Sequence, residues 1–324
     1  MAVRMGDMSV KGMTSMWNAL VRPHLEYGAE VINSHNDFVW EEAEKLARKI
    51  GRRVLKCGKR LPNDAIMGEL GWMTMRGRRM LLRLSYWSKI LAMEDGRWVK
   101  KVYEHGRRRL EKNGRANTWC NLTRKWLRDL GLEEEWKQQA VGPAWQERLK
   151  EKIMEYEARN WRRRVVREDN VKLKDYGKWK AKPELEQYLQ HEDVHQRRLW
   201  TKLRGGILEL RVETGRWERM SLGGRQERVP RRLRRCKLCF GEVEDARHVL
   251  FRCPAYGRQR EVMAVEARAQ ATPRVVGAME SVVRGKNSVA EEELLRWMMV
   301  EGGEKVGMEM LDRIMKVRAK LLGE

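Results

Sequence analysis

The chain has 324 residues, of which 42% are apolar and 35% charged, and its 69 lysines and arginines against 46 acidic residues give a formal net charge of +23. The apolar share is large enough for folded cores, so the composition excludes a wholly disordered chain, and the length favours two or three modules over one. The charge excess excludes an ordinary neutral domain and predicts a polyanionic partner, either nucleic acid or an acidic membrane face.

The sequence lacks the segments that would place a chain in a membrane or export it. The longest run without a charged residue, Gly12–Val21, has ten residues, whereas a membrane-spanning helix needs about 20. The first residues, Met1–Arg4, lack the apolar segment of a signal peptide. We therefore expect a nuclear or cytoplasmic protein that is neither secreted nor transmembrane. Of the two polyanions, nucleic acid is the expected partner, and no membrane partner is expected.

Residues 1–110 are predicted to form a helical bundle. Apolar residues recur three or four positions apart over 40–54 and again over 75–93, which is the period of an amphipathic helix. Thr74 is a suitable N-cap for the second of these helices. The polar residues 94–118 are interpreted as a boundary between modules.

Residues 111–205 are predicted to form a basic helical region. Helices are expected at 119–130 and after Pro143, where apolar residues again follow a helical spacing. A further helix is expected over 183–199, because a proline suits its first turn. Gly205 and the glycine after it would end that helix.

Residues 206–260 hold an arginine-rich segment and a cysteine cluster, and residues 261–324 are predicted to form C-terminal helices. Apolar residues alternate within 207–214, which is a weak strand signal, and a helix there stays open as an alternative. Residues 288–291 have the pattern of a capping box and are expected to open the last helices.

Three of the five cysteines lie close together in the sequence, with one histidine among them. Cys236, Cys239, His248 and Cys253 follow the spacing C-x2-C-x8-H-x4-C. The first pair can ligate one ion from a tight turn, and the second pair lies about one and a half helical turns apart. Three thiolates and one imidazole fill a tetrahedral Zn²⁺ shell, so the zinc is expected to be structural. Buried cysteines beside an unrelated histidine are the alternative.

A second metal-binding pattern, H-E-x-x-H, occurs at His191–His195. On a helix its two histidines would share one face and could hold a catalytic zinc, as in metallopeptidases. The motif helices of metallopeptidases are mostly apolar, whereas Arg197 and Arg198 follow closely here. A solvated helix face is therefore favoured, and a metallopeptidase is a remote alternative.

Other signatures of catalysis are missing from the sequence. It contains no Walker loop, no G-x-S-x-G, and no pair of adjacent aspartates of the kind that holds magnesium ions in polymerases. We therefore expect that the chain is not an enzyme on its own. The expected fold class is mainly α: a helical bundle, basic helices and a small CCHC zinc knuckle.

Two arginine-rich runs are the candidates for contacts with nucleic acid, because guanidinium groups bind phosphates bidentately. Aromatic residues beside the predicted zinc ligands are candidates for stacking on bases. The complete predicted set is Arg162, Arg163, Arg164, Arg225, Arg228, Arg231, Arg232, Arg234, Arg235, Phe240 and Tyr256. The expected partner is RNA or DNA, bound through its phosphates with low sequence specificity.

Four segments of the sequence occur in a suggestive order. They are WNALVRPHLEYGAE at 17–30, GELGW at 68–72, ETGRW at 213–217 and the cysteine cluster from Cys236 to Pro254. Together they resemble the part that follows the polymerase core in the reverse transcriptases of non-LTR (LINE-type) retrotransposons. The resemblance covers about residues 12–260, and the spacing of the cysteine cluster is its most specific part.

The resemblance implies that residues 10–100 are a thumb-like bundle, which in the family grips the template–primer duplex, and that the rest holds element RNA and target DNA. The family's palm and endonuclease have no counterpart here, and Ile32 stands where a tryptophan is expected. This chain should therefore not act as an RNA-directed DNA polymerase alone, and the remainder of a retroelement protein is an implied partner. The alternative is a domesticated, zinc-stapled scaffold that binds protein, since its 19 methionines offer adaptable apolar surface.

Overall fold

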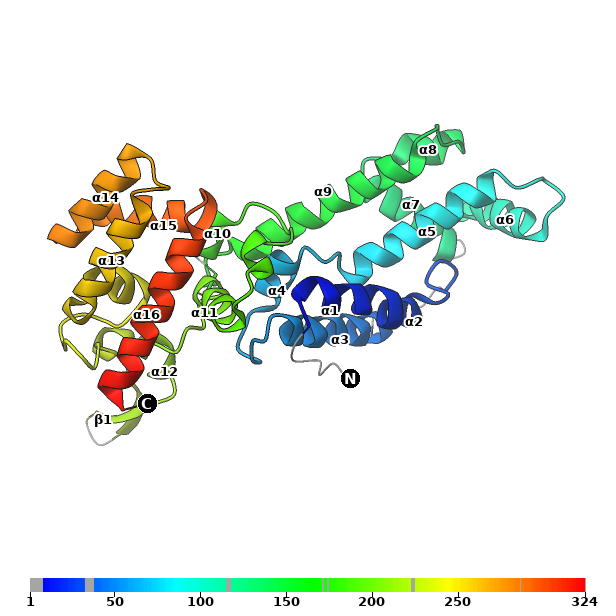
Figure 1. Cartoon of the computed structure of the whole chain (residues 1–324). Helices are drawn as coiled ribbons and strands as arrows, with labels where there is room; N and C mark the ends of the chain where they lie inside the picture. The colour runs from blue at the N-terminus through cyan, green and yellow to red at the C-terminus, as the bar shows by residue number, and fades with distance from the viewer. Residues whose placement is uncertain are drawn as a thin grey trace, which may run out of the picture. The chain divides into compact units, whose positions relative to one another are not determined.

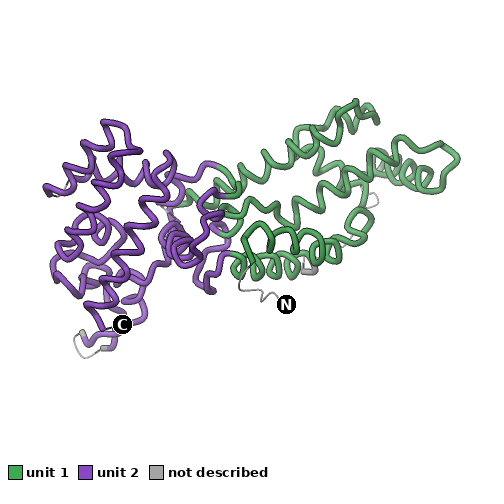
Figure 2. Tube along the Cα trace, in the orientation of Figure 1, with its two compact units in different colours: residues 1–54, 66–167, 182–185 green, residues 55–65, 168–181, 186–324 purple. Residues whose placement is uncertain are grey.

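The chain forms two compact units in the computed structural model (Figures 1 and 2). The structure describes residues 8–32, 38–114, 118–170, 172–173, 175–222, 225–285 and 287–323. Unit 1 comprises Met1–Val54, Ile66–Arg167 and Lys182–Leu185, and unit 2 comprises Leu55–Ala65, Glu168–Ala181 and Glu186–Glu324. The residues Met1–Arg4, on which the expectation about a signal peptide depends, lie outside the described part.

The mainly α fold class is confirmed, with about 68% helix and 3% strand. Within the part of the chain that the structure describes, no helix combines the length and the apolar character needed to cross a membrane. The predicted modules end at residues 110, 205 and 260. Residue 110 lies inside unit 1 and the other two lie inside unit 2, so the four predicted modules do not correspond one to one to the two units. The four-part division stays a prediction.

Unit 1 is built from helices. They are α1 (Val10–Met16), a π-helical turn (Trp17–Val21), α2 (Arg22–Glu26), α3 (Phe38–Val54), most of α4 (Asn63–Leu70), α5 (Met75–Leu91), α6 (Trp98–Asn113), α7 (Thr118–Asp129), α8 (Glu133–Gln138) and α9 (Trp145–Val165). Thr74 caps α5 as expected, because its side chain accepts the N–H of Gly77 at 2.9 Å. The segment 94–118, interpreted from its sequence as a boundary between modules, contains α6, whose buried Tyr103 and Leu110 give it an apolar face.

Part of the core of unit 1 is a cluster of aromatic side chains. The ring centroid of Trp87 lies 5.8 Å from that of Trp145 and 6.2 Å from that of Trp136. The indole N–H of Trp87 donates to the hydroxyl of Tyr103 at 2.8 Å, and this hydroxyl donates to Gln139. Burial raises the pKa of Tyr103 to about 12, so the phenol keeps the proton that it donates.

Another part of this core alternates tryptophan rings with arginine side chains. The guanidinium of Arg79 lies 4.6 Å from the ring centroid of Trp40 and 5.6 Å from that of Trp126. The guanidinium of Arg83 lies 5.4 Å from Trp126 and 5.4 Å from Trp119. Helical spacing puts Arg79 and Arg83 on one face of α5, because they are four residues apart. The three tryptophan rings come from two other helices, α3 and α7.

Burying two guanidinium groups costs free energy unless their charge is compensated. The carbonyl of Ile32 accepts a hydrogen bond from each, at 3.2 Å from Arg79 and 2.6 Å from Arg83. Burial and the neighbouring charge of Arg79 lower the pKa of Arg83 to about 10. The negative faces of the indole rings offset part of the remaining cost, so these tryptophans stabilise buried cations as well as the apolar core.

We expect Trp126→Ala to lower the free energy of unfolding by about 3–5 kcal/mol, because it leaves a cavity and removes the ring shared by Arg79 and Arg83. Trp98→Ala is the matched control, since Lys101 lies over the ring of Trp98 but that ring is 79% exposed. The control should change stability by less than about 0.5 kcal/mol. Urea denaturation followed by circular dichroism measures both, and equal losses would contradict this account of the core.

Unit 2 is also largely helical and carries one small sheet. Its elements are the first residues of α4, α10 (Tyr176–Trp179), a 3₁₀ turn (Gln187–Gln190), α11 (Val194–Arg204), α12 (Arg211–Thr214), β1 (Arg219–Leu222), β2 (Arg225–Arg228), a 3₁₀ turn (Arg231–Leu233), a π-helical turn (His248–Arg252), a 3₁₀ turn (Pro254–Tyr256), α13 (Gly257–Ala267), α14 (Pro273–Arg284), α15 (Ser288–Val300) and α16 (Glu304–Leu322). The strand interpretation of 207–214 is wrong, because α12 lies there and the strands follow it.

The N-terminus of α15 differs from the capping box expected at 288–291. Asn287 is the N-cap, and its side-chain oxygen accepts the backbone N–H groups two and three residues later, at 3.1 Å each. Glu291, the expected acidic member of the box, instead binds the guanidinium of Arg252. The box does not form because Asn287, and not Ser288, is the N-cap, and because Glu291 pairs with Arg252.

Candidate metal centre

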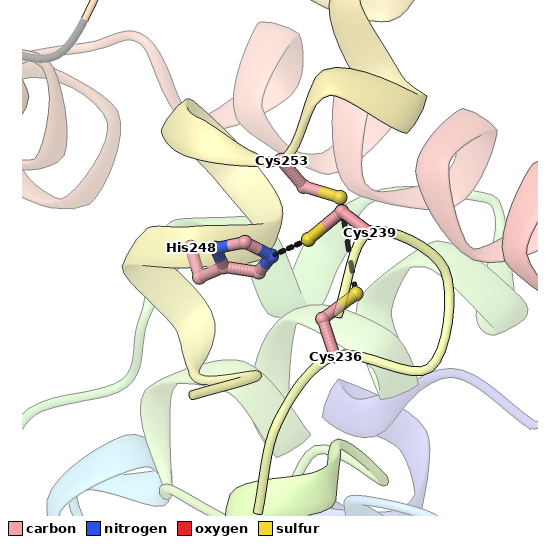
Figure 3. A group of neighbouring side chains, drawn as sticks. All are labelled: Cys236, Cys239, His248 and Cys253. Atoms are coloured by element: carbon pink, nitrogen blue, oxygen red, sulfur yellow. Dashed lines mark hydrogen bonds between the residues drawn. The ribbon is translucent and has the colours of Figure 1, made fainter. Parts of the chain in front are cut away.

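Cys236, Cys239, His248 and Cys253 converge in unit 2 (Figure 3), with their ligand atoms all within 4.8 Å of one another. The sulfurs of Cys236 and Cys253 are 3.9 Å apart, and the sulfur of Cys239 lies 3.3 Å from Nε2 of His248. In a tetrahedral zinc site with typical bond lengths, two sulfurs lie about 3.8 Å apart, and sulfur and nitrogen about 3.6 Å. The four side chains could therefore hold a metal ion, and their donor set and spacing are compatible with zinc.

A tight turn presents the first pair of ligands. The N–H of Cys236 donates to the carbonyl of Glu242 at 2.9 Å, and the N–H of Phe240 donates to the carbonyl of Cys236 at 3.0 Å. Phe240 has a φ of 57°, in the left-handed region that glycine usually occupies. This turn directs the sulfurs of Cys236 and Cys239 toward the same point (Figure 3).

A π-helical turn presents the second pair. The N–H of Cys253 donates to the carbonyl of His248, five residues earlier, at 2.7 Å. In an α-helix residues five apart point about 140° away from each other, whereas a wider turn closed by such a bond brings them nearer to one side. Asp245 caps this turn, because its carboxylate accepts the N–H of His248 at 3.0 Å. The expected one and a half helical turns are thus replaced by a π turn.

Burial acts on all three thiols, but the net shifts of their pKa values differ. Burial raises the pKa of Cys236, and it raises that of Cys253 to about 12. Burial also acts upward on Cys239, but the N–H of Gly241 and the neighbouring thiols together outweigh it and lower the pKa. Because a metal ion binds the thiolate form, a metal ion that binds to this cluster would have to displace protons.

A carboxylate lies behind the histidine. Oε2 of Glu242 is 3.6 Å from Nδ1 of His248, on the opposite side of the ring from Nε2, which faces Cys239. Metal-binding histidines commonly direct their second nitrogen toward a carboxylate, which fixes the ring and raises its basicity. Arg252 lies 3.6 Å from the same carboxylate oxygen. The surroundings of His248 therefore suit a ligand that binds through Nε2.

Buried ion pairs attach the cluster to the C-terminal helices. The buried carboxylate of Glu244 accepts hydrogen bonds from the guanidinium of Arg318 in α16, at 3.1 and 3.3 Å, and from the N–H of Arg211 at 2.7 Å. Arg252 donates two bonds of 2.6 Å to Glu291 of α15. The cluster is therefore part of the core of unit 2, although its spacing resembles that of a small separate knuckle.

The two aromatic residues predicted to stack on bases have different environments. The ring of Phe240 is 69% exposed and remains suitable for stacking. Tyr256 has no exposed surface, so the prediction that it stacks on a base is wrong. It lies in the turn directly after Cys253, where the attachment of the cluster to the helices of unit 2 buries it.

The first predicted arginine run lies at the C-terminal end of α9 in unit 1, away in the sequence from the cluster. Arg163 and Arg164 are exposed, and Arg162 is half-buried. The second run, 225–235, directly precedes the cluster in unit 2. The two runs therefore belong to different units.

The arginines of the second run are not equivalent. The guanidinium of Arg234 donates to the carbonyls of Val229, at 3.0 and 2.9 Å, and Val212, at 2.9 Å, so it holds the main chain together and is unsuited to a phosphate contact. Arg231 is exposed and lies 3.4 Å from Asp245. The others with described side chains are exposed, namely Arg228, Arg232 and Arg235. The side chain of Arg225 lies outside the described part.

Two further exposed residues, Trp217 and Arg219, are absent from the predicted set of nucleic-acid contacts. Trp217 is 66% exposed, and the guanidinium of Arg228 lies 5.8 Å from its ring centroid. Arg219 is exposed and pairs with Arg228 across the hairpin. The sequence feature that points to them is a tryptophan shortly before an arginine-rich segment. The hairpin that brings Trp217 and Arg219 close to Arg228 was not predicted.

The H-E-x-x-H pattern does not form a metal site. The helix expected over 183–199 is interrupted, and α11 begins only at Val194. Asp193 is its N-cap, with its carboxylate accepting the N–H of His195 at 2.7 Å. Because His191 precedes the helix, the two histidines do not share a helix face. Among the described residues, the group of three cysteines and His248 is the set that could hold a metal.

Comparisons with known proteins do not identify a relative of this chain. No family model, no curated protein and no solved structure matches the chain. The resemblance to LINE-type reverse transcriptases thus depends on the sequence segments alone.

We expect Arg318→Gln to lower the free energy of unfolding by about 3–5 kcal/mol, because it leaves the carboxylate of Glu244 buried without its cation. Arg313→Gln is the matched control on the same helix. Arg313 pairs with Glu266 at 2.6 and 2.7 Å, but both side chains are about one-third exposed, so the loss should be at most about 1 kcal/mol. Thermal and urea denaturation compare the two variants, and a smaller loss for Arg318→Gln than for the control would contradict the role of this pair.

Proposed function

We propose that this chain binds RNA or DNA with low sequence specificity, as the thumb and zinc-knuckle part of a LINE-type reverse transcriptase, and that a structural zinc ion stabilises it. The observation that carries the proposal is a set of exposed arginines directly before Cys236 in the sequence, here called the arginine strip. Arg228, Arg232 and Arg235 are exposed, and among the described side chains none of them has a carboxylate partner. An uncompensated positive strip of this kind attracts phosphates and releases their counterions.

The lack of acidic partners distinguishes this strip from the arginines around it. Nearby arginines are neutralised in pairs: Arg211 with Glu218, Arg216 with Glu213, Arg247 with Glu292 and Arg252 with Glu291. An arginine that already binds a carboxylate contributes less binding free energy to a phosphate contact, because the phosphate has to replace the carboxylate. A polyanion therefore gains the most binding free energy by contacting this strip.

The zinc ion in this proposal has a structural role. Its four protein ligands complete a tetrahedral shell and leave no open position, so its contribution is to cross-link the turn of Cys236 to the turn of His248. Cys236 follows Arg235 directly, and Arg235 pairs with Val243 in an antiparallel bridge. Metal binding thereby fixes the end of the arginine strip.

The alternative of a protein-binding scaffold has less support. It depends on methionine-rich surface, but many methionines lie in the core. The buried ones are Met67, Met75, Met80, Met263, Met279, Met298, Met299, Met308 and Met310. They fill the interior and offer no surface to a partner.

We also propose that the chain acts in the nucleus or cytoplasm, together with the remainder of a retroelement protein. It does not polymerise DNA alone, because its sequence has no pair of adjacent aspartates to hold two magnesium ions.

We expect the purified protein to contain about one zinc ion per chain, measured by atomic absorption. Cys236→Ser should lower the zinc content below half an equivalent and lower the melting temperature, because metal binding contributes folding free energy. Cys57→Ser is the control, since Cys57 is also a buried thiol of unit 2 but is not part of the cluster. Full zinc content in both variants would refute the zinc site.

We expect binding to labelled oligonucleotides to weaken steeply with salt, with a slope of log K against log salt near about −4 to −7, which corresponds to roughly five to eight neutralised phosphates. Replacing Arg228, Arg232 and Arg235 by glutamine should make the slope shallower by about 2–3. The control replaces three exposed arginines of unit 2 that already pair with glutamates: Arg274, Arg284 and Arg296. Fluorescence anisotropy measures the slopes, and a wild-type slope near −1 would contradict the proposal.

A further inference from the structure

The hairpin of β1 and β2 has one face whose side chains all carry hydrogen-bond donors. Arg219 is paired with Arg228, and Ser221 with Gln226. Directly opposed residues, and residues two apart on a strand, lie on the same face of a sheet. These four residues therefore share one face, here called the donor face, and all of them are exposed. Figure 1 shows the hairpin at the edge of unit 2.

The donor face is electrostatically unfavourable when nothing is bound to it. Two like charges directly opposite each other destabilise a pair of strands, and a two-stranded sheet is only marginally stable by itself. Glu227 is the acidic residue within the strands, and its pairing with Met220 puts it on the other face. Among the described residues neither Arg219 nor Arg228 has a carboxylate partner. An anionic ligand would remove the repulsion between the two arginines.

An aromatic ring lies at the base of this face. Trp217 precedes β1 by two residues, is 66% exposed, and has the guanidinium of Arg228 over its ring at 5.8 Å from the centroid. Backbone bonds hold the base of the hairpin in place, since the N–H of Trp217 donates to the carbonyl of Thr214 and the N–H of Val229 donates to the carbonyl of Glu218. Indole rings and guanidinium planes are the groups on which unpaired bases stack.

We propose that the donor face and Trp217 bind an unpaired stretch of nucleic acid. Trp217 stacks on one base, while Arg219 and Arg228 contact phosphates on either side of it. A single strand is favoured over a duplex because the faces of bases within a duplex are already covered by their neighbours. This inference rests on the proposed function and narrows the partner of the hairpin to single-stranded RNA or DNA.

The test uses the full-length, zinc-loaded protein and fluorescein-labelled probes, namely a single-stranded poly-dT oligonucleotide, a poly-U oligonucleotide and a blunt duplex of equal length. Trp217→Ala should weaken binding to the single strands roughly 5- to 100-fold, the range expected for loss of one stacked base. It should change duplex binding less than about twofold, and Trp217→Phe should restore most of the affinity. Arg219→Gln combined with Arg228→Gln should make the single-strand salt slope shallower by about 1.4.

Trp98→Ala is the matched control, because Trp98 is an exposed tryptophan with a cation, Lys101, over its ring, but it lies in unit 1. It should leave the affinities for the two single strands unchanged. Wild-type binding that does not respond to Trp217→Ala, or that falls equally for duplex and single strands, would overturn this inference and leave the proposed function standing. A wild-type protein that binds no oligonucleotide would overturn both. Partition into phosphatidylserine vesicles that depends on Trp217, without oligonucleotide binding, would assign the hairpin to a membrane surface instead.

Discussion

The buried pair of Glu244 and Arg318 connects the candidate metal centre to the rest of unit 2. Glu244 lies within the turn that links the two halves of the cluster, and its carboxylate also receives the N–H of Arg211. A carboxylate with no exposed surface is tolerated only with such partners, so the cluster, the C-terminal helix α16 and the start of α12 have to be in place together. The arrangement of the four ligand side chains and the packing of the C-terminal helices are therefore coupled parts of one core.

Arginine and tryptophan occur together in two settings that lead to different roles. In unit 1 the guanidinium groups of Arg79 and Arg83 are buried between indole rings and stabilise the core, with a shared carbonyl as acceptor. In unit 2 the ring of Trp217 and the guanidinium of Arg228 are exposed, next to an arginine on the paired strand. The chemistry is the same, and burial decides whether the pair stabilises the fold or is available to a ligand.

Metal-ligand spacing was informative only where the local conformation matched it. The C-x2-C-x8-H-x4-C pattern correctly predicted four residues that converge, although the second pair uses a π turn in place of an α-helix. The H-E-x-x-H pattern failed because Asp193 caps α11 in the middle of the motif, which leaves His191 outside the helix. Asp193 has a short side chain that competes for backbone N–H groups, a property that favours caps over helix interiors.

The sequence by itself determined the mainly helical class, the central helices of unit 1 and the identity of the cluster residues, because apolar periodicity and ligand spacing are local properties. The tertiary structure alone decided which arginines stay exposed, that Tyr256 is buried, and that Arg219 and Arg228 share a face. These outcomes depend on partners that the local pattern does not specify: the carbonyls that hold Arg234, the helices that cover Tyr256 and the register of the hairpin. A local pattern carries no information about such partners, since burial is set by whichever elements pack against it.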